Sequence, residues 1–121
     1  LPDTVQKTFN AVRNALSDEL RKPEYRGHPN KFRGHCYVAS EALHHLLGGS
    51  EAGWVPQFIR WEGAPHWYLK HPATDTILDL TAEQFSKPVP YEQGSGKGFL
   101  TSHPSKRAQV LIDRVKEPGN L

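Results

Sequence analysis

Apolar residues recur at steps of three and four near the start of the chain, which is the spacing of one face of a helix. Between Thr4 and Lys22 these positions are Val5, Phe9, Val12, Leu16 and Leu20. The spacing predicts an amphipathic helix that Asp3 or Thr4 caps and Pro23 ends. The next stretch, 24–34, holds two glycines, a proline and an asparagine, a composition typical of a loop.

A second helix is predicted from about Cys36 to Leu47, because the apolar positions again follow a helical period. Its core face comprises Val38, Ala39, Ala42, Leu43, Leu46 and Leu47. Gly48 and Gly49 follow it, and glycine ends helices because it readily adopts a left-handed conformation. The pattern predicts a last helix over 105–116, which buries Ala108, Leu111, Ile112 and Val115.

Between these helices, alternating apolar positions and β-branched or aromatic residues predict three antiparallel strands. The strands are expected at 55–61, 66–70 and 76–80. Pro56 indicates an edge position for the first, because proline cannot donate to a strand ladder. Residues 81–85 are expected to form a single helical turn that Thr81 caps.

The order helix, helix, three strands, helix predicts an α+β fold with helices packed on one face of a small antiparallel sheet. We find no repeat and no linker, so residues 1–121 are expected to form a single domain. The stretch 86–103 is a long loop rich in Gly, Ser and Pro. Loops of this length are often functional covers, so Lys87 to His103 is a candidate lid.

Composition excludes several classes of protein. The chain of 121 residues has a formal charge of +2, with its basic residues spread along it, which does not favour nucleic acid as a partner. A single cysteine rules out an internal disulfide and a zinc site of several thiolates. We see no apolar run long enough for a membrane span and no signal peptide, so we expect a cytoplasmic protein without a membrane partner. GSGKG at 94–98 lacks the spacing of a phosphate-binding loop.

The one cysteine, Cys36, lies in the first turn of the second predicted helix. Unpaired N–H groups and the helix dipole favour an anion there, so this is a place where a thiol is easily made a thiolate. His66 begins the second predicted strand, and Asp79 lies near the end of the third. The strand order brings His66 and Asp79 nearly opposite each other. The carboxylate would orient the imidazole, and the imidazole would take the thiol proton.

Four strings resemble one family in order and in spacing. They are GHCYVASEALHHLLGG, PHWYLKH, DLTAEQF and RAQVLIDRV. Together they resemble the YunG-like family of small bacterial and phage proteins. The match covers roughly Gly34 to Val115 and leaves the first helix, within 1–23, unmatched.

This resemblance implies a minimal papain-like core at 34–115, with an arrangement like that of transglutaminase and NlpC/P60 cysteine hydrolases. Cys36 and His66 would face each other, with Asp79 behind. No cofactor and no particular substrate is implied. Where the family tends to have Gln before the cysteine, this chain has His35. The oxyanion would then be held by His35, by Asn30 or by the Cys36 backbone N–H, and Trp67 and Gln84 are further candidates for substrate contacts.

We therefore expect a cysteine hydrolase or acyl-transfer enzyme of peptidase or amidase type, acting on a peptide or small amide. The alternatives are a catalytically silent papain-like module that captures a partner protein and, less favoured, a nucleic-acid-associated protein. A mixed zinc site from His35, Cys36, His66 and Asp79 would match no familiar ligand spacing. Each residue also has a structural interpretation: Cys36 as a buried thiol, His66 as a cross-strand histidine and Asp79 as a turn-capping acid. Asp75 is the rival of Asp79 for the role of the acid that orients the imidazole. The oligomeric state stays open.

Overall fold

The structure, a computed structural model, describes residues 2–117. Within this range the helices are α1 (Asp3–Ala15), α2 (Cys36–Leu46) and α3 (Lys106–Lys116). The strands are β1 (Val55–Trp61), β2 (Ala64–His71), β3 (Thr76–Leu78) and β4 (Ser95–Gly96). Short 3-10 turns lie at Asp18–Leu20, Pro23–Tyr25, Gly49–Ala52, Ala82–Gln84 and Tyr91–Gln93. The predicted α+β class is confirmed.

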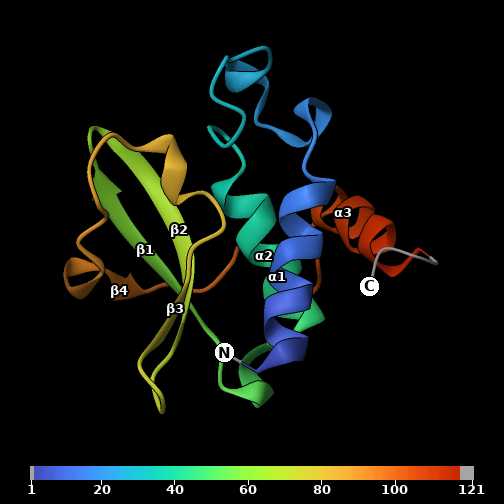
Figure 1. Ribbon diagram of the computed structural model, residues 1–121, viewed down its shortest axis with the longest axis vertical. Coiled ribbons are helices and arrows are strands. Elements are labelled where there is room, and N and C mark those ends of the chain that lie inside the picture. The colour runs from blue at the N-terminus through green and yellow to red at the C-terminus, as the bar shows by residue number, and fades with distance from the viewer. Residues whose placement is uncertain (1, 118–121) are drawn as a thin grey trace.

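The strands form one antiparallel sheet in the order β3-β2-β1-β4. β1 and β2 make a hairpin whose two-residue turn, Glu62 and Gly63, has positive φ at both positions, the geometry that suits the twist of a hairpin. Leu69 of β2 pairs with Leu78, the last residue of β3. The sheet lies on one side of the molecule and the α-helices lie on the other (Figure 1).

The edge position expected for β1 is wrong. β4, which lies inside the predicted loop, pairs with β1 at Gln57 and Phe58. Pro56 is tolerated here because β4 is only two residues long. The Lys97 N–H donates to the Pro56 carbonyl at 3.0 Å, so the proline only has to accept a hydrogen bond on this side.

α1 is shorter than its apolar pattern predicts. It ends at Ala15, Leu16 is extended, and Leu20 is buried from a separate 3-10 turn. Arg114 of α3 donates to the Ala15 carbonyl and to the Ser17 hydroxyl, which satisfies backbone that a continuing helix would have used. No side chain caps the start of α1, so the capping role expected of Asp3 or Thr4 is also wrong.

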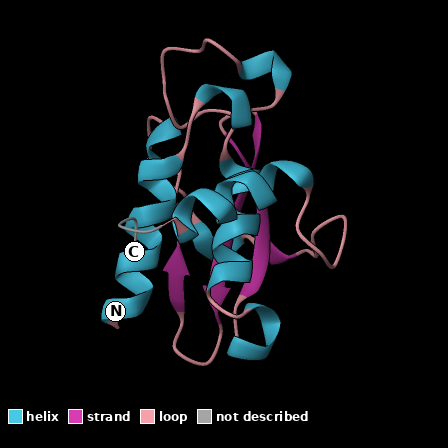
Figure 2. Ribbon diagram, turned by 90° about the vertical axis from the view of Figure 1, so that its right-hand side faces the viewer, coloured by secondary structure: helices cyan, strands magenta, loops and turns pink. Residues whose placement is uncertain are grey.

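The two faces of the sheet are covered by different parts of the chain. Alternation along β2 places Leu69 in the core against the helices and Tyr68 in a second apolar cluster. That second cluster is completed by Phe85 and Val89. The helices therefore cover one face, as expected (Figure 2). Part of the predicted loop covers the other.

A buried carboxylate joins α2 to α3. Glu41 is fully buried, and it accepts hydrogen bonds from the Ser105 N–H (2.9 Å) and the Ser105 hydroxyl (2.7 Å). The same hydroxyl oxygen accepts from the Ala108 N–H and so caps α3. No helix in residues 2–117 has the length and apolar character needed to cross a membrane.

Candidate active site

Cys36 is the first residue of α2, and the chain reaches it through a tight approach. Gly34 has a φ of +87°, and a Cβ there would lie 2.6 Å from the Cβ of Tyr25, so only glycine fits. The preceding loop is gathered by the buried Arg21, which donates to the carbonyls of Tyr25, His28 and Asn30. Cys36 is 8% exposed, with its Sγ 3.8 Å from the Pro65 carbonyl oxygen. The thiol therefore lies just beneath the surface, where α2 meets β2.

His66 of β2 is the group that connects the thiol to a carboxylate. Its side chain is fully buried, and its Nε2 lies 2.7 Å from Asp79 Oδ2. Burial lowers the pKa of His66, but hydrogen bonds to Asp79 and Cys36 and the negative charges of both groups outweigh it, so the pKa rises to about 9. Cys36, His66 and Asp79 are thus brought together as one interacting group.

Asp79 lies one residue beyond β3, where the chain leaves the sheet. Its Oδ1 accepts from the Thr81 N–H at 3.1 Å. Its Oδ2 accepts from His66 and also from the Tyr91 hydroxyl, at 2.7 Å. The rival acid, Asp75, lies in the β2–β3 turn with a φ of +56° and its carboxylate 3.4 Å from Lys70 Nζ.

Gln84 approaches the other edge of the His66 ring. It is buried, and its Nε2 lies 3.1 Å from His66 Nδ1 and 3.1 Å from Thr81 Oγ1. In the neutral ring, with its one proton on Nε2 toward Asp79, Nδ1 is the acceptor for the amide. The structure therefore places Gln84 against the imidazole, with its amide nitrogen shared between the ring and Thr81.

The side chains of His35 and Asn30 are both engaged with backbone carbonyls. The buried His35 ring has Nδ1 2.8 Å from the Lys31 carbonyl and Nε2 2.9 Å from the Ser17 carbonyl. The Asn30 amide donates to the Glu83 carbonyl at 3.1 Å. The Cys36 N–H is at the first position of α2, where no intrahelical acceptor exists. Of the three predicted oxyanion donors, this backbone N–H has the fewest competing hydrogen-bond acceptors.

Trp67 is 9% exposed and belongs to an aromatic cluster on the helix side of β2. Its ring centroid lies 5.0 Å from that of Tyr37, the residue after the cysteine, and 5.5 Å from those of Phe58 and Phe99. Trp61, the last residue of β1, donates from its indole N–H to the Lys87 carbonyl. Trp67 thus borders the thiol's helix from a mostly buried position.

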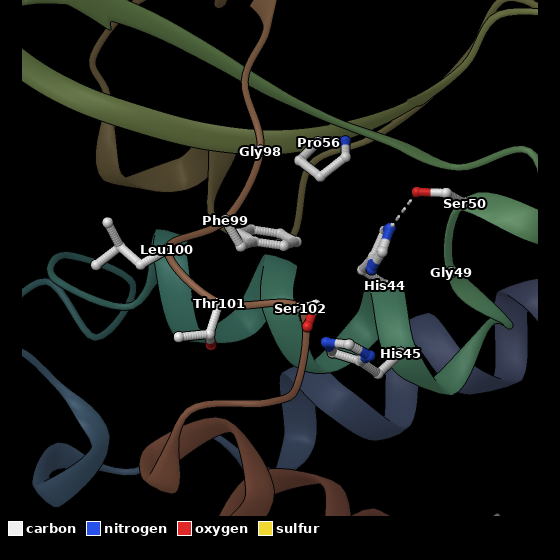
Figure 3. Close-up of a pocket in the computed structure, with 10 residues that line it drawn as sticks. All are labelled: His44, His45, Gly49, Ser50, Pro56, Gly98, Phe99, Leu100, Thr101 and Ser102. Carbon is white, nitrogen blue, oxygen red and sulfur yellow. Dashed lines mark hydrogen bonds between the residues drawn. The ribbon is translucent and has the colours of Figure 1, made fainter.

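A cavity of about 480 Å³ lies away from these residues, between the end of α2 and residues 98–102 (Figure 3). His44 and His45 line it, and Ser50 Oγ lies 3.5 Å from His44 Nε2. The nitrogens without a hydrogen-bond partner, His44 Nδ1 and His45 Nε2, are buried from solvent, so they cannot contact a molecule in the cavity. Within residues 2–117, no group of three or more His, Cys, Asp or Glu residues is arranged to hold a metal ion, and the zinc alternative has no support.

Sequence reasoning included Asp79 as the acid that caps the following turn, which it does by accepting from the Thr81 N–H, but it missed Tyr91 as a partner of Asp79. Thr81 follows Asp79 by two residues, a spacing at which an aspartate often accepts from the backbone, so this contact had a local signal. Tyr91 lies 12 residues away in a segment with no periodic pattern, and nothing in the sequence indicated it.

Comparison of the chain with protein-family models, with curated proteins and with solved structures found no match. The resemblance to the YunG-like family stays a prediction.

Proposed function

We propose that this protein is a cysteine-dependent hydrolase or acyl-transfer enzyme that acts on an amide bond through Cys36, His66 and Asp79. One observation carries the proposal: a fully buried imidazole bound at 2.7 Å to a carboxylate and also interacting with the chain's one thiol. A buried histidine with an elevated pKa between an acid and a nucleophile is a typical arrangement of nucleophilic catalysis.

The chemistry follows from this order of groups. His66 takes the thiol proton, and the thiolate Sγ bonds to the carbonyl carbon of the amide. The carbonyl oxygen becomes an oxyanion, and the Cys36 N–H at the start of α2 can donate to it. The C–N bond then breaks as His66 gives its proton to the leaving amine. Water, or a second amine in a transfer reaction, attacks the resulting thioester and restores the thiol.

Asp79 and Gln84 hold the imidazole from opposite edges in this scheme. Asp79 fixes the tautomer that carries its proton on Nε2 and stabilises the imidazolium once the thiol proton is transferred. Gln84 contacts Nδ1 of the neutral ring, and its amide must turn away when Nδ1 takes the thiol proton, because a protonated Nδ1 no longer accepts a hydrogen bond. A thiol that begins a helix, with its base on the adjoining sheet, supports the papain-like core and the YunG-like resemblance. We further propose a peptide or small amide substrate and a cytoplasmic location.

The test is the rate at which iodoacetamide alkylates the single thiol between pH 5 and pH 9. We expect the folded protein to react below pH 7, because a neighbouring base activates the thiol. His66→Ala should slow the reaction at pH 7 about ten-fold or more. His71→Ala is the matched control, since His71 lies at the far end of β2 and binds the Ala52 carbonyl. Its rate should stay within about two-fold of the wild type.

Two outcomes would contradict the proposal. A thiol that is unreactive up to pH 9 in the folded protein, yet reactive in the denatured chain, would be a core residue. A His66→Ala variant that reacts as fast as the wild type would show that the imidazole does not activate the thiol. Either result would favour the catalytically silent binding module, whose partner affinity should survive Cys36→Ser.

A further inference from the structure

The acid of the proposed triad has a second side-chain donor. Tyr91 lies in the 3-10 turn Tyr91–Gln93, in the segment that covers the sheet face opposite the helices. Its hydroxyl donates at 2.7 Å to Asp79 Oδ2, the same oxygen that receives the His66 Nε2–H at 2.7 Å. One carboxylate oxygen is therefore shared between the catalytic base and a phenol.

Tyr91 is held firmly in this position. Its carbonyl accepts from the Tyr68 hydroxyl at 3.1 Å, and the two rings meet edge to face with centroids 4.9 Å apart. Gly94 leaves room for this contact, because a Cβ at position 94 would lie 1.8 Å from the Tyr68 hydroxyl oxygen. Burial and then the Asp79 charge raise the pKa of Tyr91. The hydroxyl thus keeps its proton and acts as a donor.

We propose that Tyr91 is a positioning residue of the triad, which sets through Asp79 how strongly the carboxylate holds the His66 imidazolium. This inference rests on the proposed function. An oxygen that accepts two hydrogen bonds offers less charge to each donor than an oxygen that accepts one. Without the Tyr91 hydroxyl, Oδ2 would serve His66 alone, and the imidazole would keep its proton to higher pH. Tyr91 itself has no contact with the thiol or with Nδ1 of His66 that would make it a reacting group.

A cavity beside this pair makes the role of the hydroxyl testable by chemical rescue. The cavity has a volume of about 290 Å³ and is lined by Gln6, Phe9, Ile77, Leu78, Asp79 and Tyr91. Truncation of Tyr91 would enlarge it by the volume of a phenol ring, directly beside the carboxylate. After the truncation, Phe9, Ile77 and Leu78 would form apolar walls and the Asp79 carboxylate would face the vacated space, a site that would accept a phenol molecule.

The first experiment follows the protonation of His66 by NMR of its side-chain nitrogens, with the signal assigned by its absence in His66→Gln. In the wild type the midpoint should lie near pH 9. In Tyr91→Phe it should move upward by about 0.7 pH unit, the equivalent of one ordinary hydrogen bond. Tyr37→Phe is the matched control, because it removes a tyrosine hydroxyl that bonds to the Leu100 N–H and not to Tyr91 or Asp79, and its midpoint should stay at the wild-type value. An unchanged or lowered midpoint in a folded Tyr91→Phe protein would overturn the inference.

The second experiment separates the hydroxyl from the packing of the ring. Tyr91→Ala is titrated alone, with phenol and with toluene, and the alkylation rate of Cys36 is recorded in parallel. Phenol should return the His66 midpoint to the wild-type value, and toluene should not. Equal restoration by both compounds, or by neither in a folded variant, would show that Tyr91 acts by packing and would overturn the inference. If His66→Ala slows alkylation while the Tyr91 variants leave the midpoint unchanged, the proposed function stands and this inference alone fails.

Discussion

Within residues 2–117 two carboxylate side chains are buried, and they differ in what they hold. Glu41 is fully buried and accepts two hydrogen bonds from Ser105. The side chain of Asp79 is 4% exposed and accepts from His66, Tyr91 and the Thr81 backbone. Every donor to Glu41 is a neutral group of one serine, whereas one donor to Asp79 is an imidazole that gains and loses its proton.

The group that a buried acid binds, rather than its burial, indicates whether the acid has a structural or a chemical role. Glu41 places a negative charge at the N-terminus of α3, where the helix dipole favours it, and so joins two helices. Asp79 raises the pKa of an imidazole that also interacts with a thiol. A search for buried acids alone would rank the two residues equally.

The largest effect on stability is expected from Glu41→Ala. The substitution leaves the part-buried Ser105 N–H and hydroxyl without their acceptor and a gap in place of a fully buried side chain, which should cost about 3 kcal/mol in the free energy of unfolding. Urea denaturation measures this loss, and the alkylation rate of Cys36 in the folded variant should match the wild type. A loss of thiol reactivity with little loss of stability would mean that Glu41 acts on the thiol, and the contrast between Glu41 and Asp79 would then be wrong.

An effect of similar size is expected from pH alone. The pKa of His66 rises from an ordinary 6.5 to about 9 in the folded protein, so the folded state binds this proton more tightly than the unfolded chain. Its contribution to stability is complete below pH 6.5 and is lost as the pH rises through about 9. The free energy of unfolding should therefore fall by on the order of 3 kcal/mol between pH 6.5 and pH 10.

Urea denaturation at a series of pH values checks this slope. Burial lowers the pKa of His35 and of His44 below the ordinary 6.5, away from the window in which His66 titrates. His66→Gln should flatten the slope, whereas the control His71→Ala should keep it. A stability that rises with pH between 7 and 9 would contradict the assignment of this proton to His66.

The smallest of the three effects concerns thiol reactivity. Asp79→Asn should slow alkylation of Cys36 at pH 7 by about ten-fold, because a neutral amide no longer stabilises the imidazolium. The matched control is Glu41→Gln, which makes the same change of charge at the other buried acid and should leave the rate within about two-fold. Equal effects of the two substitutions would mean that the thiol senses general loss of packing.

The sequence predicted the elements that local rules determine. Alternation gave β1, β2 and β3, and the turn after β2 placed Asp79 close enough for His66 to bind. Gly48 and Gly49 both have positive φ where α2 ends, as a helix stop requires. These features depend on residues that are near one another in the chain.

Features that depend on distant residues were missed or wrong. The end of α1 is decided partly by Arg114, which is 99 residues beyond Ala15. The pairing of β4 with β1 joins a two-residue strand that no pattern of alternation could reveal. His35 precedes the cysteine in sequence, which suggested that its ring binds the oxyanion. In the structure both ring nitrogens lie within hydrogen-bond distance of backbone carbonyls instead.

Gly94 shows that a side chain can matter by being absent. Its φ of −74° is one that any residue adopts, so its backbone does not demand glycine. The demand comes from the Tyr68 hydroxyl, which occupies the place where a methyl group would stand. Anyone who grafts the proposed catalytic groups onto another scaffold, or diversifies this one in a library, has to keep glycine at position 94 as strictly as the cysteine.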